Sequence, residues 1–504
     1  MLTMMVTSFK ERARRSSFWL LMGVVVVLAV LATPRSDTAM KVMVLAPKIY
    51  QQADNPTWLP VCAASIFGTF LPLFGFGVVA NALQTDREQG LWPWVETTRF
   101  ARLRYGFAHF GANCLILLTM LLLTILATGA MMVLRFPGQG IPAATFVSPF
   151  LVLIPSIILL AALALLGESV TAKRHNGLIA VYMFSLFYVF ALQLTDPTNF
   201  WNLLLNLSGN NYVQDVIDQS SIQATGHPIT SMQLLSNYRG PQGTHTLVMT
   251  GVHWTRAMLL MMLGEIMVAL AITGVAALLM HRARRWRKVR PEPTAATTPK
   301  TAPVPYSPVA ETHFSWLAVL RGEARCQWQD RSRLYRWALL AGWLVIWIMP
   351  ETARQQAGLP ILWLFSLPWL SDLGTAPKRW TAWLPTMPHA PQRQKFAELI
   401  VGAATAVLLM LPFLVHAGAA VPQLLLFALA NAVFAQGLAS LLNNGRLFTM
   451  LLAMFWFLYL NGIPGMISFN RFSLAESAVY LLVIAGSLGL TFAAEYRRQL
   501  SAAN

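Results

Sequence analysis

A single carboxylate, Glu265, interrupts the uncharged run Leu259–Met267 and is the first residue that could do chemistry. An ionisable side chain inside an apolar helix is costly, so such a group is a candidate for contact with a transported molecule. It can instead make a hydrogen bond to a neighbouring helix, in its protonated form where needed. We favour the hydrogen bond and keep Glu265 as the intramembrane polar candidate.

Histidines and cysteines are not spaced as metal ligands. His227, His245 and His253 are loosely spaced in one polar segment, and the cysteines at 62, 114 and 326 have no metal spacing or plausible disulfide partner. The chain has no Gly-x-x-x-x-Gly-Lys-[Ser/Thr] phosphate loop, His-Glu-x-x-His zinc motif or nucleophile elbow. We therefore predict no catalytic, cofactor-binding or metal-binding residue, and no ATP hydrolysis by the chain itself.

The apolar blocks that surround these residues identify the class of protein. Of 504 residues, 56% are hydrophobic and only 11% are charged, against about a quarter in soluble proteins. Uncharged blocks such as 59–84 and 115–134 reach the roughly 20 residues that cross a bilayer as a helix. Barrel strands are shorter, at roughly 10 residues, and alternate. The sequence therefore predicts an all-α polytopic membrane protein with about twelve transmembrane helices and no soluble enzyme.

The charge-poor blocks fall into two sets of six. The first set lies near 17–33, 59–83, 105–134, 147–166, 177–194 and 254–281, and the second near 337–351, 359–376, 396–417, 419–442, 446–465 and 474–493. Glu168, His109 and Glu398 lie close to predicted span ends, where a side chain can reach the interface.

Basic residues predict the sidedness of these spans. They concentrate in alternate loops, as in the Arg282–Arg290 run, and the positive-inside rule then places both termini in the cytosol. The formal net charge of +17 is thereby explained by topology and anionic headgroups, without nucleic-acid binding. We predict a multi-pass protein of the bacterial inner membrane.

A Pro-, Thr- and Ala-rich linker divides the chain into two related halves. It occupies 282–315, between a first half at 1–281 and a second at 316–504, and its composition suits an extended cytosolic segment. The segments that begin at Trp94 and Trp383 match without gaps in six positions. Each half also opens with a charged segment, Phe9–Arg14 and Leu320–Arg325. We infer a duplication.

The loop after the second span carries a recognisable pattern. It reads Asp86-Arg87-Glu88-Gln89-Gly90, then Thr97-Thr98, then Arg99–Arg104 entering the third span; the second half keeps Asp372, Gly374, Thr386, Pro388, Arg393 and Lys395. This pattern resembles the permeases of type-2 ATP-binding-cassette exporters. The chain departs from it in having Thr98 where Pro is commoner and in lacking the Glu in its second half.

The resemblance implies a membrane subunit that forms the translocation path, with ATP hydrolysis in separate subunits. Its expected partners are two ABC-type ATPase subunits, membrane lipid and a periplasmic accessory protein. It further implies interfacial amphipathic helices and an outer loop at 195–253 with short helices, one of them at Asn199–Leu207. The candidate ATPase-coupling residues are Asp86, Glu88, Gly90, Trp94, Arg99, Arg102, Trp383 and Arg393.

Two other classes were weighed. Secondary transporters of the major facilitator type also have about twelve spans in two halves, but their loop pattern Gly-x-x-x-Asp-Arg-x-Gly-Arg-Arg is broken here. Ala82 stands at the first glycine, and the closing basic pair after Gly90 is missing. A membrane-embedded transferase would need an acidic or histidine cluster at a membrane face, and the sequence offers none.

Overall fold

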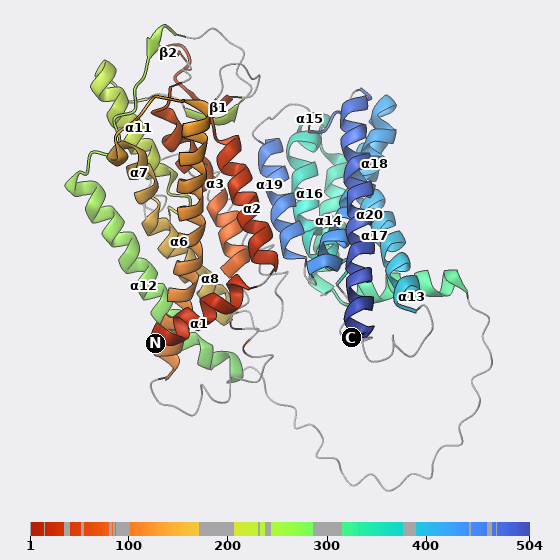
Figure 1. Cartoon of the computed structure of the whole chain (residues 1–504). Helices are drawn as coiled ribbons and strands as arrows, with labels where there is room; N and C mark the ends of the chain where they lie inside the picture. Colours follow the sequence, from red (N-terminus) through yellow and green to blue (C-terminus); the bar gives the residue numbers. More distant parts are fainter. Residues whose placement is uncertain are drawn as a thin grey trace.

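The chain folds into two groups of helices that stand side by side, as the computed structural model shows (Figure 1). The structure describes residues 2–14, 16–34, 41–51, 55–79, 83, 86, 101–170, 206–229, 232–236, 243–285, 315–331, 333–375, 390–442, 445–460, 466–469 and 471–503. The predicted helical membrane protein is confirmed within these ranges.

The first half contains α1 (Leu2–Ala13), α2 (Ser16–Leu31), α3 (Trp58–Val79), α6 (Ala101–Arg135), α7 (Ala143–Leu151), α8 (Ile154–Val170), α11 (Asn210–Thr225) and α12 (Arg256–Arg285). The second half contains α13 (Trp316–Gln329), α14 (Arg333–Ile348), α15 (Glu351–Ala353), a π-helical stretch (Arg354–Gly358), α16 (Leu359–Leu370), α17 (Ala390–Leu414), a 3-10 turn (Gly418–Ala420), α18 (Val421–Leu442), α19 (Arg446–Leu460) and α20 (Leu474–Ala503).

Fewer helices than twelve are long and apolar enough to span a membrane by themselves. Among the described residues six qualify, namely Leu103–Arg135, Ala143–Val170, Arg256–Met280, Arg393–Leu414, Gly418–Leu442 and Leu474–Arg497; α1 with α2 makes a seventh if that bent pair is one span. Helices occupy the other expected blocks but are shorter or interrupted, as Pro72 interrupts α3. The expected span at 177–194 lies outside the described residues.

Both ends of the chain lie at one end of the bundle (Figure 1). We call this end the terminal face and the opposite end the distal face. At the terminal face α1 turns by 79° from the axis of α2, and α13 lies across the bundle. Both are the amphipathic segments that open the two halves. Helix α12 continues to Arg285, beyond the boundary expected at 281.

The distal face contains short strands that the sequence analysis did not predict. Strand β1 (Lys41–Leu45) pairs antiparallel with β3 (Met232–Ser236), and β2 (Tyr50–Gln51) pairs parallel with β4 (His245–Thr246). We call the segment between α11 and α12, residues 226–255, the distal segment. The two strand pairs join it by backbone hydrogen bonds to the segment before α3. The helix expected at Asn199–Leu207 falls mostly outside the described residues. The helix that the structure describes in this region is α11, which begins at Asn210.

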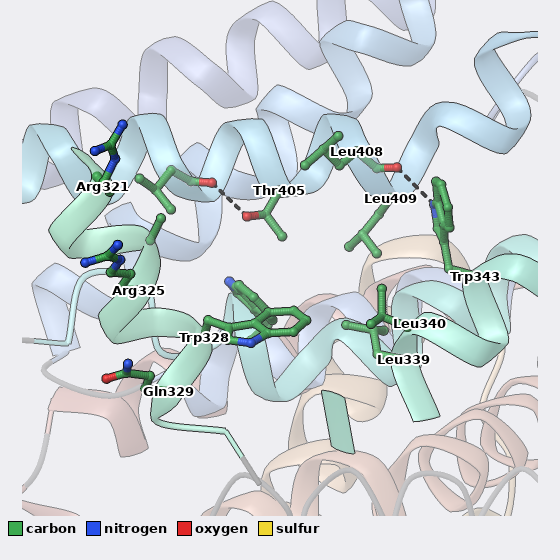
Figure 2. A pocket seen from close by; sticks show the side chains of 13 residues that line it. Arg321, Arg325, Trp328, Gln329, Leu339, Leu340, Trp343, Thr405, Leu408 and Leu409 are labelled. Atoms are coloured by element: carbon green, nitrogen blue, oxygen red, sulfur yellow. Dashed lines mark hydrogen bonds between the residues drawn. The ribbon is translucent and has the colours of Figure 1, made fainter. Parts of the chain in front are cut away.

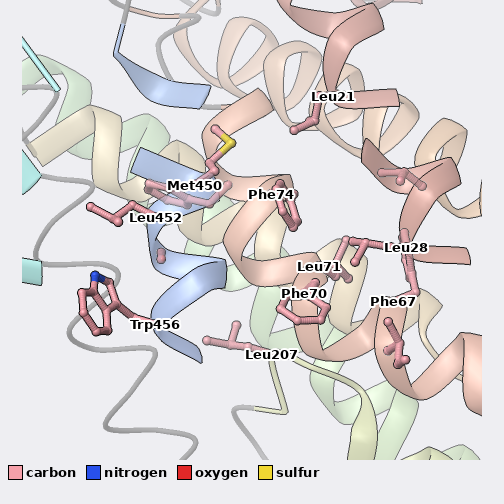
Figure 3. Packing of buried hydrophobic residues seen from close by; sticks show 14 of the residues in the cluster. Leu21, Leu28, Phe67, Phe70, Leu71, Phe74, Leu207, Met450, Leu452 and Trp456 are labelled. Atoms are coloured by element: carbon pink, nitrogen blue, oxygen red, sulfur yellow. The ribbon is translucent and has the colours of Figure 1, made fainter. Parts of the chain in front are cut away.

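The two halves meet where α3 packs against α19, within one continuous apolar core (Figure 3). Phe70 and Phe457 are in edge-to-face contact, with ring centroids 5.2 Å apart. Gly77 lies so close to Met450 that a Cβ at position 77 would fall 1.5 Å from its Cε atom. A larger residue at 77 would therefore force the methionine out of the contact between the halves.

Candidate functional site

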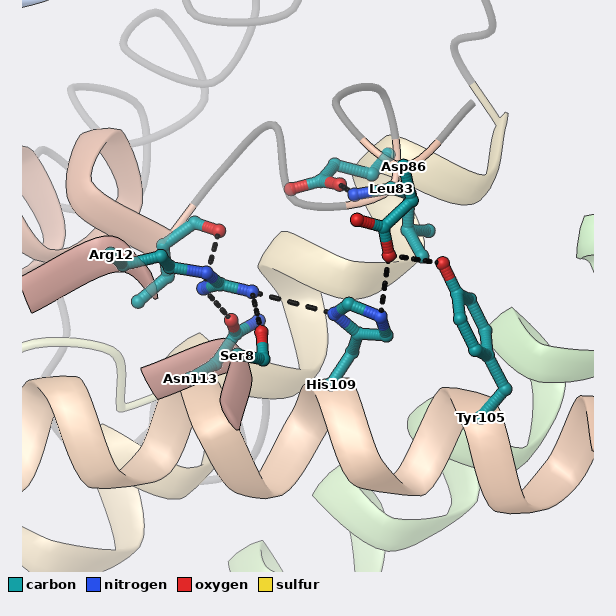
Figure 4. Close-up of polar contacts among 9 residues, drawn as sticks. Ser8, Arg12, Leu83, Asp86, Tyr105, His109 and Asn113 are labelled. Atoms are coloured by element: carbon teal, nitrogen blue, oxygen red, sulfur yellow. Dashed lines mark hydrogen bonds and ion pairs between the residues drawn. The ribbon is translucent and has the colours of Figure 1, made fainter. Parts of the chain in front are cut away.

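The main polar cluster at the terminal face joins α1, the end of α3 and α6 (Figure 4). We call it the Asp86 cluster; its side chains are those of Ser8, Arg12, Asp86, Tyr105, His109 and Asn113. Tyr105, His109 and Asn113 are four residues apart in α6, a spacing that puts them on one face of the helix. That face is turned toward α1.

Arg12 is the centre of the α1 side of this cluster. Only 6% of its surface is exposed, because its guanidinium lies between α1 and α6. It donates to Oδ1 of Asn113 at 2.5 Å, to the carbonyl of Val79 at 3.3 Å and to Oγ of Ser8 at 3.3 Å. A buried charge is tolerated only when its donors are used in this way. Arg12 thus fastens the amphipathic helix α1 to two other helices.

His109 connects Arg12 to Asp86. Nη2 of Arg12 lies 3.4 Å from Nδ1 of His109, and Nε2 of His109 lies 3.1 Å from Oδ2 of Asp86. A guanidinium can only donate, so a hydrogen bond between these two groups requires Nδ1 to accept and assigns the ring proton to Nε2, on the side of the carboxylate. Tyr105 donates to the same Asp86 oxygen at 2.5 Å. Burial acts to raise the pKa of Asp86, but the contacts with His109 and Tyr105 outweigh it and hold that pKa below its ordinary value.

A second carboxylate holds the backbone beside Asp86. The N–H of Leu83 donates to Oε2 of Glu168 in α8 at 2.8 Å. Asp86 and Leu83 follow α3 closely, so α8 and α6 together determine where the segment after α3 starts. This segment is the one in which the coupling residues were predicted.

The second half repeats this arrangement with different side chains. The N–H of Gly374, shortly after α16, donates to Oε1 of Glu398 in α17 at 2.8 Å. Asp372 is paired with Arg331, at 2.5 Å, just after the amphipathic helix α13. In each half, therefore, a buried glutamate accepts from a backbone N–H that follows α3 or α16. An aspartate beside it pairs directly with Arg331 in the second half and is linked to Arg12 through His109 in the first.

The ungapped register of the two halves explains part of this likeness. Continuing the match of Arg104 with Arg393 places His109 opposite Glu398, and the match of Phe9 with Leu320 places Arg12 opposite Glu323. Glu323 interacts electrostatically with Glu398, as Arg12 contacts His109. The same two positions are therefore polar in both halves. They hold the basic residues Arg12 and His109 in the first half and the acidic residues Glu323 and Glu398 in the second.

The predicted coupling residues are only partly placed. Asp86 is in the cluster, Arg102 belongs to the first turn of α6, and Arg393 is exposed in the first turn of α17. Glu88, Gly90, Trp94, Arg99 and Trp383 lie outside the described residues. Sequence reasoning missed Arg12, Tyr105 and Asn113, although the spacing of Tyr105, His109 and Asn113 was a usable signal.

Glu265, the intramembrane candidate, is bound on both oxygens. Oε1 accepts from Ser156 of α8 at 3.2 Å, and Oε2 accepts from Tyr212 of α11 at 2.9 Å. Only 1% of Glu265 is exposed. These are hydrogen bonds to neighbouring helices, the kind of contact that the sequence analysis favoured. They also anchor the start of α11 at the depth of Glu265 in α12.

A cavity of about 570 Å³ lies between α11 and the first turns of α12, next to this contact. Its wall includes Asp215 and Asp218, the apolar Met258 and Met261, and the 1%-exposed Asn206. Desolvation and the nearby charge of Asp218 raise the pKa of Asp215 to about 6. The Asp215 side chain still reaches solvent, so this shift carries little energy. The histidines of the distal segment do not gather here, and no group of metal-binding side chains occurs among the described residues.

Comparison with known proteins adds no relative. No family model, curated protein or solved structure matches the chain.

Proposed function

We propose that the chain is the membrane subunit of an ATP-driven exporter of the type-2 ATP-binding-cassette class. The Asp86 cluster is the observation that carries this proposal. It ties the amphipathic helix α1, the segment that follows α3 and the span α6 together at the terminal face. A soluble ATPase that pushed on this segment would move α1 and α6 with it. That is the mechanical link that an ATP-driven permease requires.

The proposal includes the finer topology. The terminal face is cytosolic, in the bacterial inner membrane, and the shorter apolar helices, including α14 and α19, cross the bilayer together with the six longer ones. The two halves then make one complete translocation path along the α3–α19 contact, so that one copy of this 55.8 kDa chain pairs with two ATPase subunits. Substrate passes outward between the halves. The distal segment contacts a periplasmic accessory protein.

The test is isolation of the tagged full-length chain from its native membrane in mild detergent. Because the sequence contains no phosphate loop, any ATP hydrolysis in the eluate comes from a bound partner. We expect such hydrolysis, with a native mass of one chain and two ATPases. Two copies of this chain per pair of ATPases would contradict the stoichiometry. Absence of an ATPase, together with transport driven by a proton gradient, would favour the secondary transporter instead.

Coupling is tested by Glu88→Gln and Arg99→Gln, with Arg256→Gln as the matched control. Arg256 is an exposed basic residue at the distal end of α12, where no ATPase can reach. We expect normal membrane insertion for all three variants but slower ATP hydrolysis in proteoliposomes for the first two. Unchanged hydrolysis and unchanged ATPase binding would leave these residues only a role in topology.

A further inference from the structure

An apolar groove lies under the amphipathic helix α13 at the terminal face of the second half (Figure 2). It runs between α13 and the spans α14 and α17 and has a volume of about 540 Å³, within the range of ligand pockets. Its walls are formed by Ala324 and Trp328 of α13, by Leu339 and Leu340 of α14, and by Leu408 and Leu409 of α17.

Three polar groups in the wall of this groove are already hydrogen-bonded within the protein. The indole N–H of Trp343 donates to the carbonyl of Leu408 at 3.0 Å, and the Thr405 hydroxyl donates to the carbonyl of Val401 at 2.8 Å. The indole N–H of Trp369 donates to Oε1 of Gln327 at 3.0 Å. The wall between α14 and α17 therefore offers an occupant mainly apolar contact, which suits a hydrocarbon chain, while the exposed Gln329 amide lies on the α13 side.

The mouth of the groove is basic. Arg321 and Arg325 are one turn apart in α13, both are exposed, and both border the groove. The one acidic residue between them, Glu323, is hydrogen-bonded to Gln327 at 3.1 Å. The Trp328 ring below them is itself covered by the Arg336 guanidinium, 5.3 Å from its centroid. An anion beside Arg321 and Arg325 is favoured by the field of all three cations.

We propose that this groove binds one anionic phospholipid. Its phosphate is held by Arg321 and Arg325, and one acyl chain lies along the leucines of α14 and α17. The charged mouth and the apolar interior match the two ends of such a molecule, and α13 lies across the bundle end as an interfacial helix does. The inference requires only that the chain spans a membrane, and it is independent of the proposed ATP-driven transport.

The experiment measures lipid binding to the full-length chain in detergent by native mass spectrometry. Phosphatidylglycerol is compared with phosphatidylcholine of the same acyl chains. The headgroup without chains, glycerophosphoglycerol, serves as a competitor. We expect one tightly bound phosphatidylglycerol, preferred over phosphatidylcholine, and no competition from the free headgroup. Equal binding of the two lipids, or displacement by the free headgroup, would overturn the proposal.

Three variants locate the lipid. R321Q/R325Q should weaken phosphatidylglycerol binding about thirtyfold, from the loss of two basic residues near a headgroup. Ala324→Trp keeps both charges but fills the groove from the exposed side of α13, and should also weaken it. K10Q/R14Q removes two exposed charges of the first half, at the positions that match Arg321 and Arg325, one in α1 and one just after it; it should leave lipid binding unchanged. An equal loss in the K10Q/R14Q control, or full binding by Ala324→Trp, would show that no lipid sits in this groove.

Discussion

Nη2 of Arg12 lies 3.4 Å from Nδ1 of His109, so an arginine of the amphipathic helix α1 is held against a side chain of the long apolar helix α6. This contact, together with the hydrogen bonds of Arg12 to Asn113 and Val79, fixes α1 to the helix bundle. A soluble partner that touches α1 or the segment after α3 thus acts on α6 through side chains that cannot separate without leaving a buried charge unpaired.

Arg12→Gln should therefore lower the free energy of unfolding by about 3 kcal/mol, the cost of breaking a buried charged network. Arg14→Gln, at an exposed position just after the end of α1, should change it little. Thermal unfolding of the purified chain in detergent measures both. Equal effects of the two substitutions would mean that the charge of α1, and not the cluster, matters.

The Asp86 contacts should make stability depend on acid pH in a defined direction. The pKa of Asp86 is below its ordinary value of 3.8, so its contribution is fully present above that value and is lost as the pH falls through the lower pKa of the folded state. The difference in unfolding temperature between the wild-type chain and Asp86→Asn should be constant from about pH 7 to about pH 5, then shrink below about pH 4. A difference that grew on acidification would contradict the assignment.

Tyr212→Phe should cost about 2 kcal/mol, because it removes a hydrogen bond to a buried acid and leaves Glu265 with Ser156 alone. In an E265Q background the same change should cost less, since the acceptor is no longer an acid. A double-mutant cycle on the unfolding free energies measures this coupling. Additive effects would show that the two side chains do not interact in the folded protein.

Gly374→Ala tests the turn that presents a backbone N–H to Glu398. Gly374 has a φ of +81°, and a Cβ there would lie 2.5 Å from the carbonyl oxygen of Gln436. Strain and overlap together should cost about 3 kcal/mol. Gly418→Ala is the control, with a φ of +50° and open space around the added carbon, and should cost about 1 kcal/mol. Similar unfolding temperatures for the two variants would contradict the close packing of α18 on this turn.

Sidedness is testable by cysteine labelling in a background without Cys62, Cys114 and Cys326. A membrane-impermeant maleimide should label Ala224→Cys in intact cells but reach Ala296→Cys only after permeabilisation. The first position is exposed at the end of α11 on the distal face, and the second is in the basic, Pro-rich linker. The reverse pattern would invert the proposed topology.

Local sequence was sufficient for the class of protein and for most of its helices. Long uncharged blocks must satisfy their backbone internally in lipid, and the expected spans at 105–134 and 254–281 are occupied by α6 and by α12, which begins at Arg256. Composition could not settle the number of independent spans. The length of α3 or α19 that remains straight and apolar depends on Pro72 and on packing against neighbours.

The site, by contrast, was decided by tertiary structure. The sequence marked Asp86 as a member of a loop pattern and Glu265 as an isolated acid, but their partners Arg12, His109 and Tyr212 are far away along the chain. A polar side chain in an apolar environment takes whichever donor or acceptor the packing brings within about 3 Å. Strand pairing of β1 with β3 likewise joins segments that five helices of the described residues separate along the chain. Periodicity and charge predict what each segment must bury, whereas only the assembled bundle decides which segments meet.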